Sequence, residues 1–116
     1  MLALAGALPE RWEPRLLFPD HATGRNFVDH AHAEGLDAAT VAPDAWAAAL
    51  DDAAVIHIHA GIGWEGHDLC ALARRTGTSV VRTEHLPWVI TCPGQKAAYA
   101  AMIADVDALI TVSHAA

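Results

Sequence analysis

The sequence predicts an α/β fold, a Rossmann-like parallel β-sheet covered by helices on both faces. Short apolar runs alternate with helical patterns along the 116 residues, and the most apolar run, Ala54 to His59, breaks into glycines before a helical pattern. Buried parallel strands are almost continuously apolar, and right-handed crossover helices cover both faces of such a sheet. The length fits one domain, so we expect a single Rossmann-like domain over residues 1–116.

The first half of the chain carries clear start and stop signals for its elements. Proline and glycine interrupt regular structure, so Pro9 and Pro19 each close an element and Gly35 ends a helix. Asp44, directly after Pro43, is a suitable N-cap for a short helix. The elements predicted in this half are a helix end at 1–8, a strand at 15–18, a helix at 24–34, a strand at 37–42 and a short helix at 44–50.

The second half continues the alternation of strands and helices. Leu69, Leu72 and Ala73 share one face of a helical pattern that Gly77 stops, and Cys70 on the apolar side is expected to be a buried free thiol. The predicted elements are a strand at 54–59, a helix from 64 or 65 to 75, a strand at 79–84, a helix at 94–104 with Ala98, Met102 and Ile103 toward the core, and a strand at 108–112.

The chain begins in the middle of an element, which affects the predicted sheet. In a doubly wound sheet the first strand is central, so its loss leaves a gap between its two neighbours. We therefore expect a gap between the two strands that would flank the missing one, in a chain that is part of a longer polypeptide. Free strand edges beside that gap would favour self-association.

Charge and hydropathy exclude two classes of partner. The formal net charge is −7 with only seven Lys and Arg residues, whereas nucleic-acid binders gather basic residues on one face, so we expect no nucleic-acid partner. No apolar run approaches the roughly 20 residues of a spanning helix, and Met1 to Leu8 lacks the features of a signal peptide. These features favour a cytoplasmic protein.

Two histidines and a group of glycines mark the best candidate site. His57 and His59 share a face of one predicted strand because side chains alternate with period two. This spacing is open to two interpretations, a metal site or a core histidine at position 57 bonded to backbone with His59 at the strand tip. Gly61 and Gly63 are equally open: they allow close backbone approach of a ligand, or a tight strand-to-helix turn.

Three segments together resemble a known family. VIHIHAG (55–61), SVVRTEHLP (79–87) and DVDALITVSHAA (105–116) resemble, in order, the strand ends of the N-terminal domain of family 4 retaining glycosyltransferases with the GT-B fold. Upstream, LAGALPERWEPRLLFP (4–19) is similar to that family's first helix, loop and second strand. The resemblance covers most of the chain, but the family's first Gly-rich loop and its E-x7-E motif fall outside it.

The resemblance implies an acceptor-side domain of an enzyme that transfers a sugar from a nucleotide-sugar donor to a sugar, lipid or small-molecule acceptor. The donor would be held by a C-terminal domain outside this chain, so the chain alone should be inactive. No metal or cofactor is implied, and peripheral membrane contact of the complete enzyme is compatible with it. His85, in the T-x-H position, is the implied catalytic residue. The residues implied or placed at strand ends for substrate binding are His21, Arg25, His59, Gly61, Gly63, Trp64 and Ser113.

Two other functions share these features. A metal-dependent hydrolase would use the H-x-H pair, with His67 and His85, to hold a divalent ion that activates water. Such enzymes usually need a barrel of about 250 residues, for which this chain has no room. A non-catalytic Rossmann-like binding module would show the same fold without the chemistry.

Overall fold

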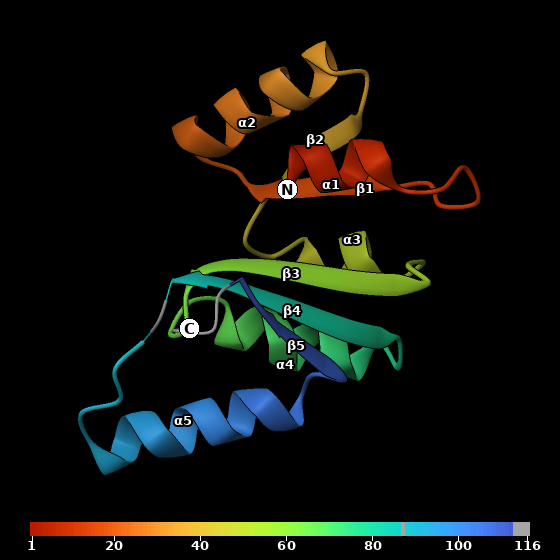
Figure 1. Cartoon of the computed structure of the whole chain (residues 1–116). Coiled ribbons are helices and arrows are strands. Elements are labelled where there is room, and N and C mark those ends of the chain that lie inside the picture. The colour runs from red at the N-terminus through yellow and green to blue at the C-terminus, as the bar shows by residue number, and fades with distance from the viewer. Residues whose placement is uncertain (87, 113–116) are drawn as a thin grey trace. The chain divides into compact units, whose positions relative to one another are not determined.

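The computed structural model of the chain describes residues 1–86 and 88–112 and is an α/β structure (Figure 1). Helices and strands alternate throughout the described part. In chain order the elements are α1 (Leu2–Ala7), β1 (Arg15–Pro19), α2 (Ala22–Ala33), β2 (Asp37–Val41), α3 (Trp46–Leu50), β3 (Val55–Ile62), α4 (His67–Arg75), β4 (Ser79–Leu86), α5 (Pro93–Ala104) and β5 (Ala108–Thr111).

The predicted order of elements is confirmed, and the differences lie at element ends. α2 begins at Ala22, two residues before the predicted start, because the His21 side chain caps it. α4 begins only at His67, since Gly66 before it adopts a left-handed conformation with φ of 69°. β3 and β4 run two to three residues beyond the predicted ends, because their pairing continues to Ile62 and Leu86.

All strand pairs are parallel, and they form two small sheets. β1 pairs with β2, and the second sheet has the order β3-β4-β5. β1 and β3 belong to different sheets, and the gap expected beside a missing strand stays a prediction. The chain divides accordingly into two compact units, Met1–Ala49 and Leu50–Ala116, each described by itself below.

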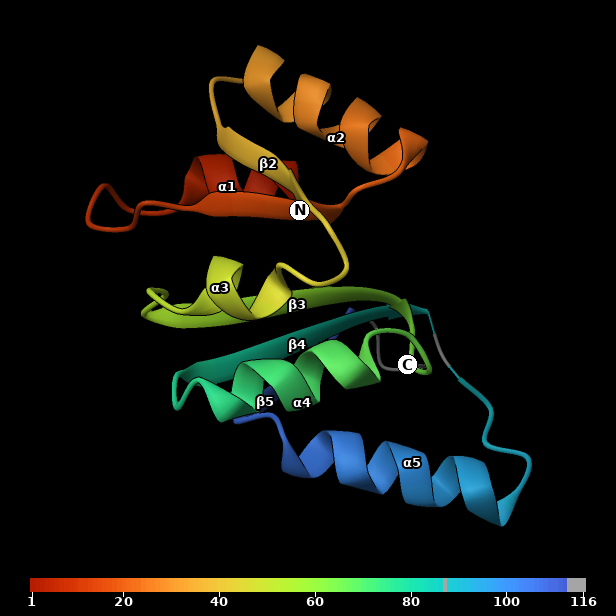
Figure 2. The ribbon, with the colours of Figure 1, turned by 180° about the vertical axis from the view of Figure 1, so that it is seen from behind.

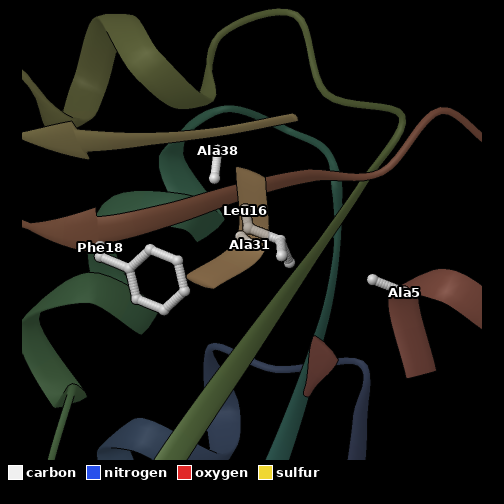
Figure 3. Close-up of a cluster of buried hydrophobic side chains, with 5 residues drawn as sticks. All are labelled: Ala5, Leu16, Phe18, Ala31 and Ala38. Atoms are coloured by element: carbon white, nitrogen blue, oxygen red, sulfur yellow. The ribbon is translucent and has the colours of Figure 1, made fainter. Parts of the chain in front are cut away.

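The first unit is built around one small apolar cluster (Figure 3). Leu16 and Phe18 alternate on β1 and point to one face, and Ala38 lies opposite Leu16 in the parallel register. Ala31 of α2 and Ala5 of α1 complete the buried cluster. Gly24 in the first turn of α2 allows this packing, because a Cβ there would overlap the Pro19 carbonyl oxygen.

In the second unit α4 and α5 lie together on one side of the β3-β4-β5 sheet (Figure 2). The alternate residues Ile56, Ile58 and Ala60 of β3 are buried, as is Val80 of β4. From the helices, Cys70 and Ala73 of α4 and Met102 of α5 are buried too. Cys70 is a free thiol, as predicted, and burial raises its pKa, so it stays protonated.

The other residues of β3 and β4 belong to the opposite face of this sheet. Val55, His57, His59 and His85 alternate with the buried set and are exposed or half-buried. This is the face that carries the candidate site.

Candidate functional site

His59 and His85 lie side by side at the carboxyl end of the second sheet. His59 is opposite Thr83 in the parallel register, and His85 is two residues further along β4 on the same face. The His59 Nδ1 and His85 Nε2 atoms are 3.2 Å apart, within hydrogen-bond distance. The two rings are nearly parallel, with an interplanar angle of 22°. Ligands of open α/β sheets bind at this edge.

His57 supports this pair from beneath rather than joining it as a third ligand-facing group. Its ring stacks on that of His59 with centroids 4.2 Å apart. Its Nε2 atom is 2.8 Å from the Thr83 hydroxyl oxygen, a side-chain partner on the neighbouring strand. The interpretation of His57 as a core histidine bonded to backbone is therefore wrong, because its ring is exposed and its partner is a hydroxyl.

The two histidines of β3, His57 and His59, are held in the neutral form at neutral pH. Burial lowers the pKa of His59 to about 4, and the neighbouring His57 charge acts in the same direction. Burial, and then the charge of His85, also lower the pKa of His57. A neutral imidazole has one N–H donor and one bare nitrogen acceptor.

The contact between the two rings determines what the pair offers to a ligand. One ring donates its N–H across the 3.2 Å contact, so its outer nitrogen is bare. The other ring accepts with its bare nitrogen, so its outer nitrogen carries the proton. Whichever ring donates, His59 Nε2 and His85 Nδ1 together present one donor and one acceptor. These two outer nitrogens lie at opposite ends of the pair, so they can bond to two separate hydroxyl groups of a ligand, one of which donates while the other accepts.

The glycine turn after β3 is filled by a side chain of the protein. The Glu65 carboxylate accepts hydrogen bonds from the backbone N–H groups of Gly61, at 2.7 Å, and of Ile62, at 3.4 Å. A Cβ on Gly61 would approach this carboxylate to 2.9 Å. A Cβ on Gly63 would lie 3.0 Å from the Trp88 Cβ. These contacts favour the interpretation of the glycines as a tight, closely packed turn.

A buried ion pair lies on the other face of β4, directly behind the histidines. Arg82 is fully buried, and its Nε donates to the Glu84 carboxylate at 3.0 Å. The Tyr99 hydroxyl of α5 contacts both oxygens of the same carboxylate, at 3.2 and 3.1 Å. Burial and the Glu84 charge raise the pKa of Tyr99, so its hydroxyl stays protonated and donates.

The same network holds the turn that follows β3. Arg82 Nη2 and His67 Nε2 both donate to the Gly63 carbonyl oxygen, at 3.2 and 2.6 Å. Trp88 and Tyr99 pack edge to face above this turn. The network therefore joins β4, α5 and the β3–α4 turn around two buried charges.

Sequence reasoning did not find this network, although one signal for it was present. Arg82 and Glu84 are two residues apart in an apolar strand, so they share a face, and opposite charges on a buried face have to pair. Tyr99 was missed because the predicted core face of α5 was wrong. Of Ala98, Met102 and Ile103, only Met102 is buried.

The remaining predicted site residues are distributed over both units. In the first unit His21 Nδ1 accepts from the Gly24 N–H as the cap of α2, and Arg25 pairs with Asp20 at 2.8 Å. In the second unit Trp64 lies in the turn after β3 and is 58% exposed. Ser113 lies outside the described residues.

The geometry also bears on the metal hypothesis. His59 Nδ1 bonds to His85 Nε2, whereas His57 Nε2 bonds to the Thr83 hydroxyl, so the two histidines of the H-x-H pair have different partners. Within residues 1–86 and 88–112, no group of three or more His, Cys, Asp or Glu side chains is arranged to hold a metal ion. In the same part of the chain, no helix has the length and apolar character needed to cross a membrane.

Comparisons with known proteins gave no match. No family model matches the sequence, and neither the curated proteins nor the solved structures contain a significant match to it.

Proposed function

We propose that this chain is the acceptor-side part of a retaining glycosyltransferase of the family 4 type. The reaction transfers a sugar from a nucleotide-sugar donor to a sugar, lipid or small-molecule acceptor. The donor is bound by a second domain outside this chain. In this proposal the enzyme works in the cytoplasm, with peripheral membrane contact where the acceptor is a lipid.

The observation that carries the proposal is the His59–His85 pair at the carboxyl end of the second sheet. An acceptor with several hydroxyls can donate to one outer nitrogen of the pair and accept from the other, because each hydroxyl can do either. The pKa of His59, lowered to about 4, keeps its ring uncharged at neutral pH, so the pair recognises a polar, uncharged group. Sugars and polyols are ligands of this kind.

Neighbouring groups support a sugar acceptor. Trp64 exposes an aromatic ring in the turn at the same end of β3, and aromatic faces pack against the apolar faces of sugar rings. In the Gly-rich turn the Glu65 carboxylate occupies the N–H groups of Gly61 and Ile62, where a donor phosphate would otherwise bind. This agrees with an acceptor side that leaves the donor phosphates to another domain.

The test measures sugar transfer by the protein expressed from its complete reading frame. Nucleoside diphosphate release is followed with a panel of nucleotide sugars and sugar or lipid acceptors. We expect His85→Ala to lower turnover by about 100-fold, the typical loss when one preorganised hydrogen-bonding group is removed. His30→Ala, an exposed histidine on α2, is the matched control and should keep wild-type turnover.

Two results would overturn the proposal. Absence of nucleoside diphosphate release with every donor and acceptor pair contradicts the activity itself. Full turnover in His85→Ala contradicts the role of the histidine pair while leaving the activity in place.

A further inference from the structure

We propose that the His59–His85 pair takes up one proton, on His85, and that the protonated pair binds a small oxyanion, the chemistry shared by carboxylate and phosphate groups. The inference rests on the contact between the two rings and on their different burial. It concerns binding by this chain alone, so it is independent of the proposed function.

The contact between the two rings accommodates one further proton but not two. In the neutral pair one proton lies between His59 Nδ1 and His85 Nε2, which are 3.2 Å apart, and one outer nitrogen is bare. A proton added to that outer nitrogen leaves the contact intact. A second added proton would place an N–H on each of the two facing nitrogens, so repulsion between two charged rings would replace the hydrogen bond.

Burial determines which ring carries the charge. His59 is half-buried under the stacked ring of His57, whose centroid is 4.2 Å away, whereas His85 is exposed. Burial disfavours a charged ring and lowers the pKa of His59 to about 4, and the charges of His57 and His85 act in the same direction. His59 therefore stays neutral and accepts from His85 Nε2, while His85 carries the proton and both of its nitrogens donate.

The charge on His85 has no counter-charge among the described side chains. Each ion pair between described residues joins an arginine to an aspartate or a glutamate, so none includes a histidine. The Glu84 carboxylate is bound to Arg82 on the opposite face of β4, and that of Glu65 is bound to backbone N–H groups of the turn after β3. His57 also faces the pair, but burial and the charge of His85 lower its pKa, so it adds no charge.

The added proton changes the class of ligand that the pair recognises. The neutral pair presents one donor and one acceptor at its outer nitrogens, whereas the protonated pair presents two donors and one positive charge. A hydroxyl that donates then loses its partner, while an anion oxygen accepts a charge-assisted hydrogen bond from His85 Nδ1. The contact with His59 holds the His85 ring in place, which reduces the entropy lost when the anion binds.

The experiment titrates the ¹⁵N-labelled full chain with sodium sulfate at constant ionic strength, at pH 5 and at pH 7.5. Sulfate keeps its charge over this range, so a change in affinity reports the protein. We expect sulfate to shift the His85 imidazole signals at pH 5. Above the pH at which His85 loses its proton, the affinity should fall by about tenfold per pH unit.

Two substitutions at His59 form a matched pair. His59→Asn keeps an acceptor oxygen for the His85 N–H, and it should keep the acid-dependent binding of sulfate. His59→Leu removes the acceptor and should weaken this binding by about tenfold, the typical effect of losing one hydrogen bond to a charged group. His85→Gln should abolish the pH dependence, and His30→Ala is the control that should bind as wild type does.

The imidazole ¹⁵N signals also count the protons on the pair. At pH 5 we expect two protonated nitrogens on His85 and a bare Nδ1 on His59. The inference is overturned by equal sulfate affinity at the two pH values, by a pH dependence that persists in His85→Gln, or by equal affinities of His59→Asn and His59→Leu. Protonation of both rings together would overturn it as well.

Discussion

At the residue scale, three consecutive positions of β4 show how alternation separates chemistry from packing. Thr83 and His85 point to the open face, where they contact His57 and His59. Glu84 between them points into the interface with the helices and pairs with Arg82. β4 thus carries His85, one member of the ligand-facing pair, on one face and the buried Arg82–Glu84 ion pair on the other.

The buried charge pair makes a strong prediction for stability. Glu84→Gln removes the negative charge and leaves the Arg82 guanidinium, which is 0% exposed, without a counter-charge. Breaking a buried pair on one side costs about 3–5 kcal/mol. We therefore expect the free energy of unfolding, measured by urea titration with near-UV circular dichroism, to fall by about 3 kcal/mol.

The matched control is an exposed pair in the same unit. Arg74 and Asp107 are 3.1 Å apart with side chains 49% and 46% exposed, and exposed pairs add little to stability because solvent screens their charges. Arg74→Gln should therefore change the unfolding free energy much less than Glu84→Gln does. Equal effects of the two substitutions would show that the buried pair is not the source of the loss.

At the scale of elements, the turn between β3 and α4 is held by contacts from three directions. Glu65 binds the N–H groups at the end of β3, while Arg82 and His67 bind the Gly63 carbonyl oxygen. Trp88 lies against Gly63 on the side where a Cβ would be. The turn is therefore packed too closely for a larger residue.

Gly63→Ala tests this packing. The added Cβ would lie 3.0 Å from the Trp88 Cβ and 3.2 Å from its Cε3, and a Cβ cannot move without its backbone. Overpacking of this kind costs about 1–3 kcal/mol, and the near-UV dichroism of Trp88 and Tyr99 should change with it. Gly94→Ala on α5, where the nearest atom would be Cys92 Sγ at 3.9 Å, should not lower the unfolding free energy. Wild-type stability of Gly63→Ala would contradict the close packing.

The existence of these elements could be predicted from local sequence signals. Pro19, Gly35 and Gly77 mark ends that depend only on backbone conformation, and both glycines have positive φ in the structure. The ends of β3 and β4 could not be predicted in the same way. They depend on Ile62 pairing with Leu86, a contact between distant parts of the sequence.

The candidate site could be predicted only in part for the same reason. Period two places His57 and His59 on one face, and the strand end places His85 at the ligand-binding edge. The contact of His59 with His85 depends on the β3–β4 register, which no local pattern encodes. Tyr99 joins Glu84 from a helix whose weak amphipathicity gave the wrong core face.

At the scale of the whole molecule, the described chain forms two small parallel sheets in which most strands lie at an edge. β4 is the only described strand with a neighbour on each side, whereas β1 and β3 each have one. Free strand edges are sites for pairing with another strand, so self-association through the edge strands stays a prediction. The net charge of −7 opposes it through repulsion between copies.

The unfolding free energy of the chain should depend on pH through the protonation of His59 and His57. The pKa of His59 is near 6.5 in an unfolded chain and about 4 in the folded one, so between these values the unfolded state binds more protons. The contribution of His59 to the unfolding free energy is therefore fully present above about pH 6.5 and is lost as the pH falls toward 4. The lowered pKa of His57 acts in the same direction.

The measurement compares the unfolding free energies of wild type and His59→Asn between pH 7 and pH 4.5, with a chelator present. Because the His59 ring is partly exposed, solvent screening reduces its contribution, and we expect wild type to lose about 1 kcal/mol more than the variant. Asp107 has a lowered pKa and is an acceptor for Val80 N–H and Arg74, so its contribution is lost only at lower pH and does not interfere. Parallel losses in wild type and variant over this range would mean that His59 is as easily protonated in the folded chain as in the unfolded one. The neutral donor–acceptor pair inferred for the site would then not exist at the acidic end of the range.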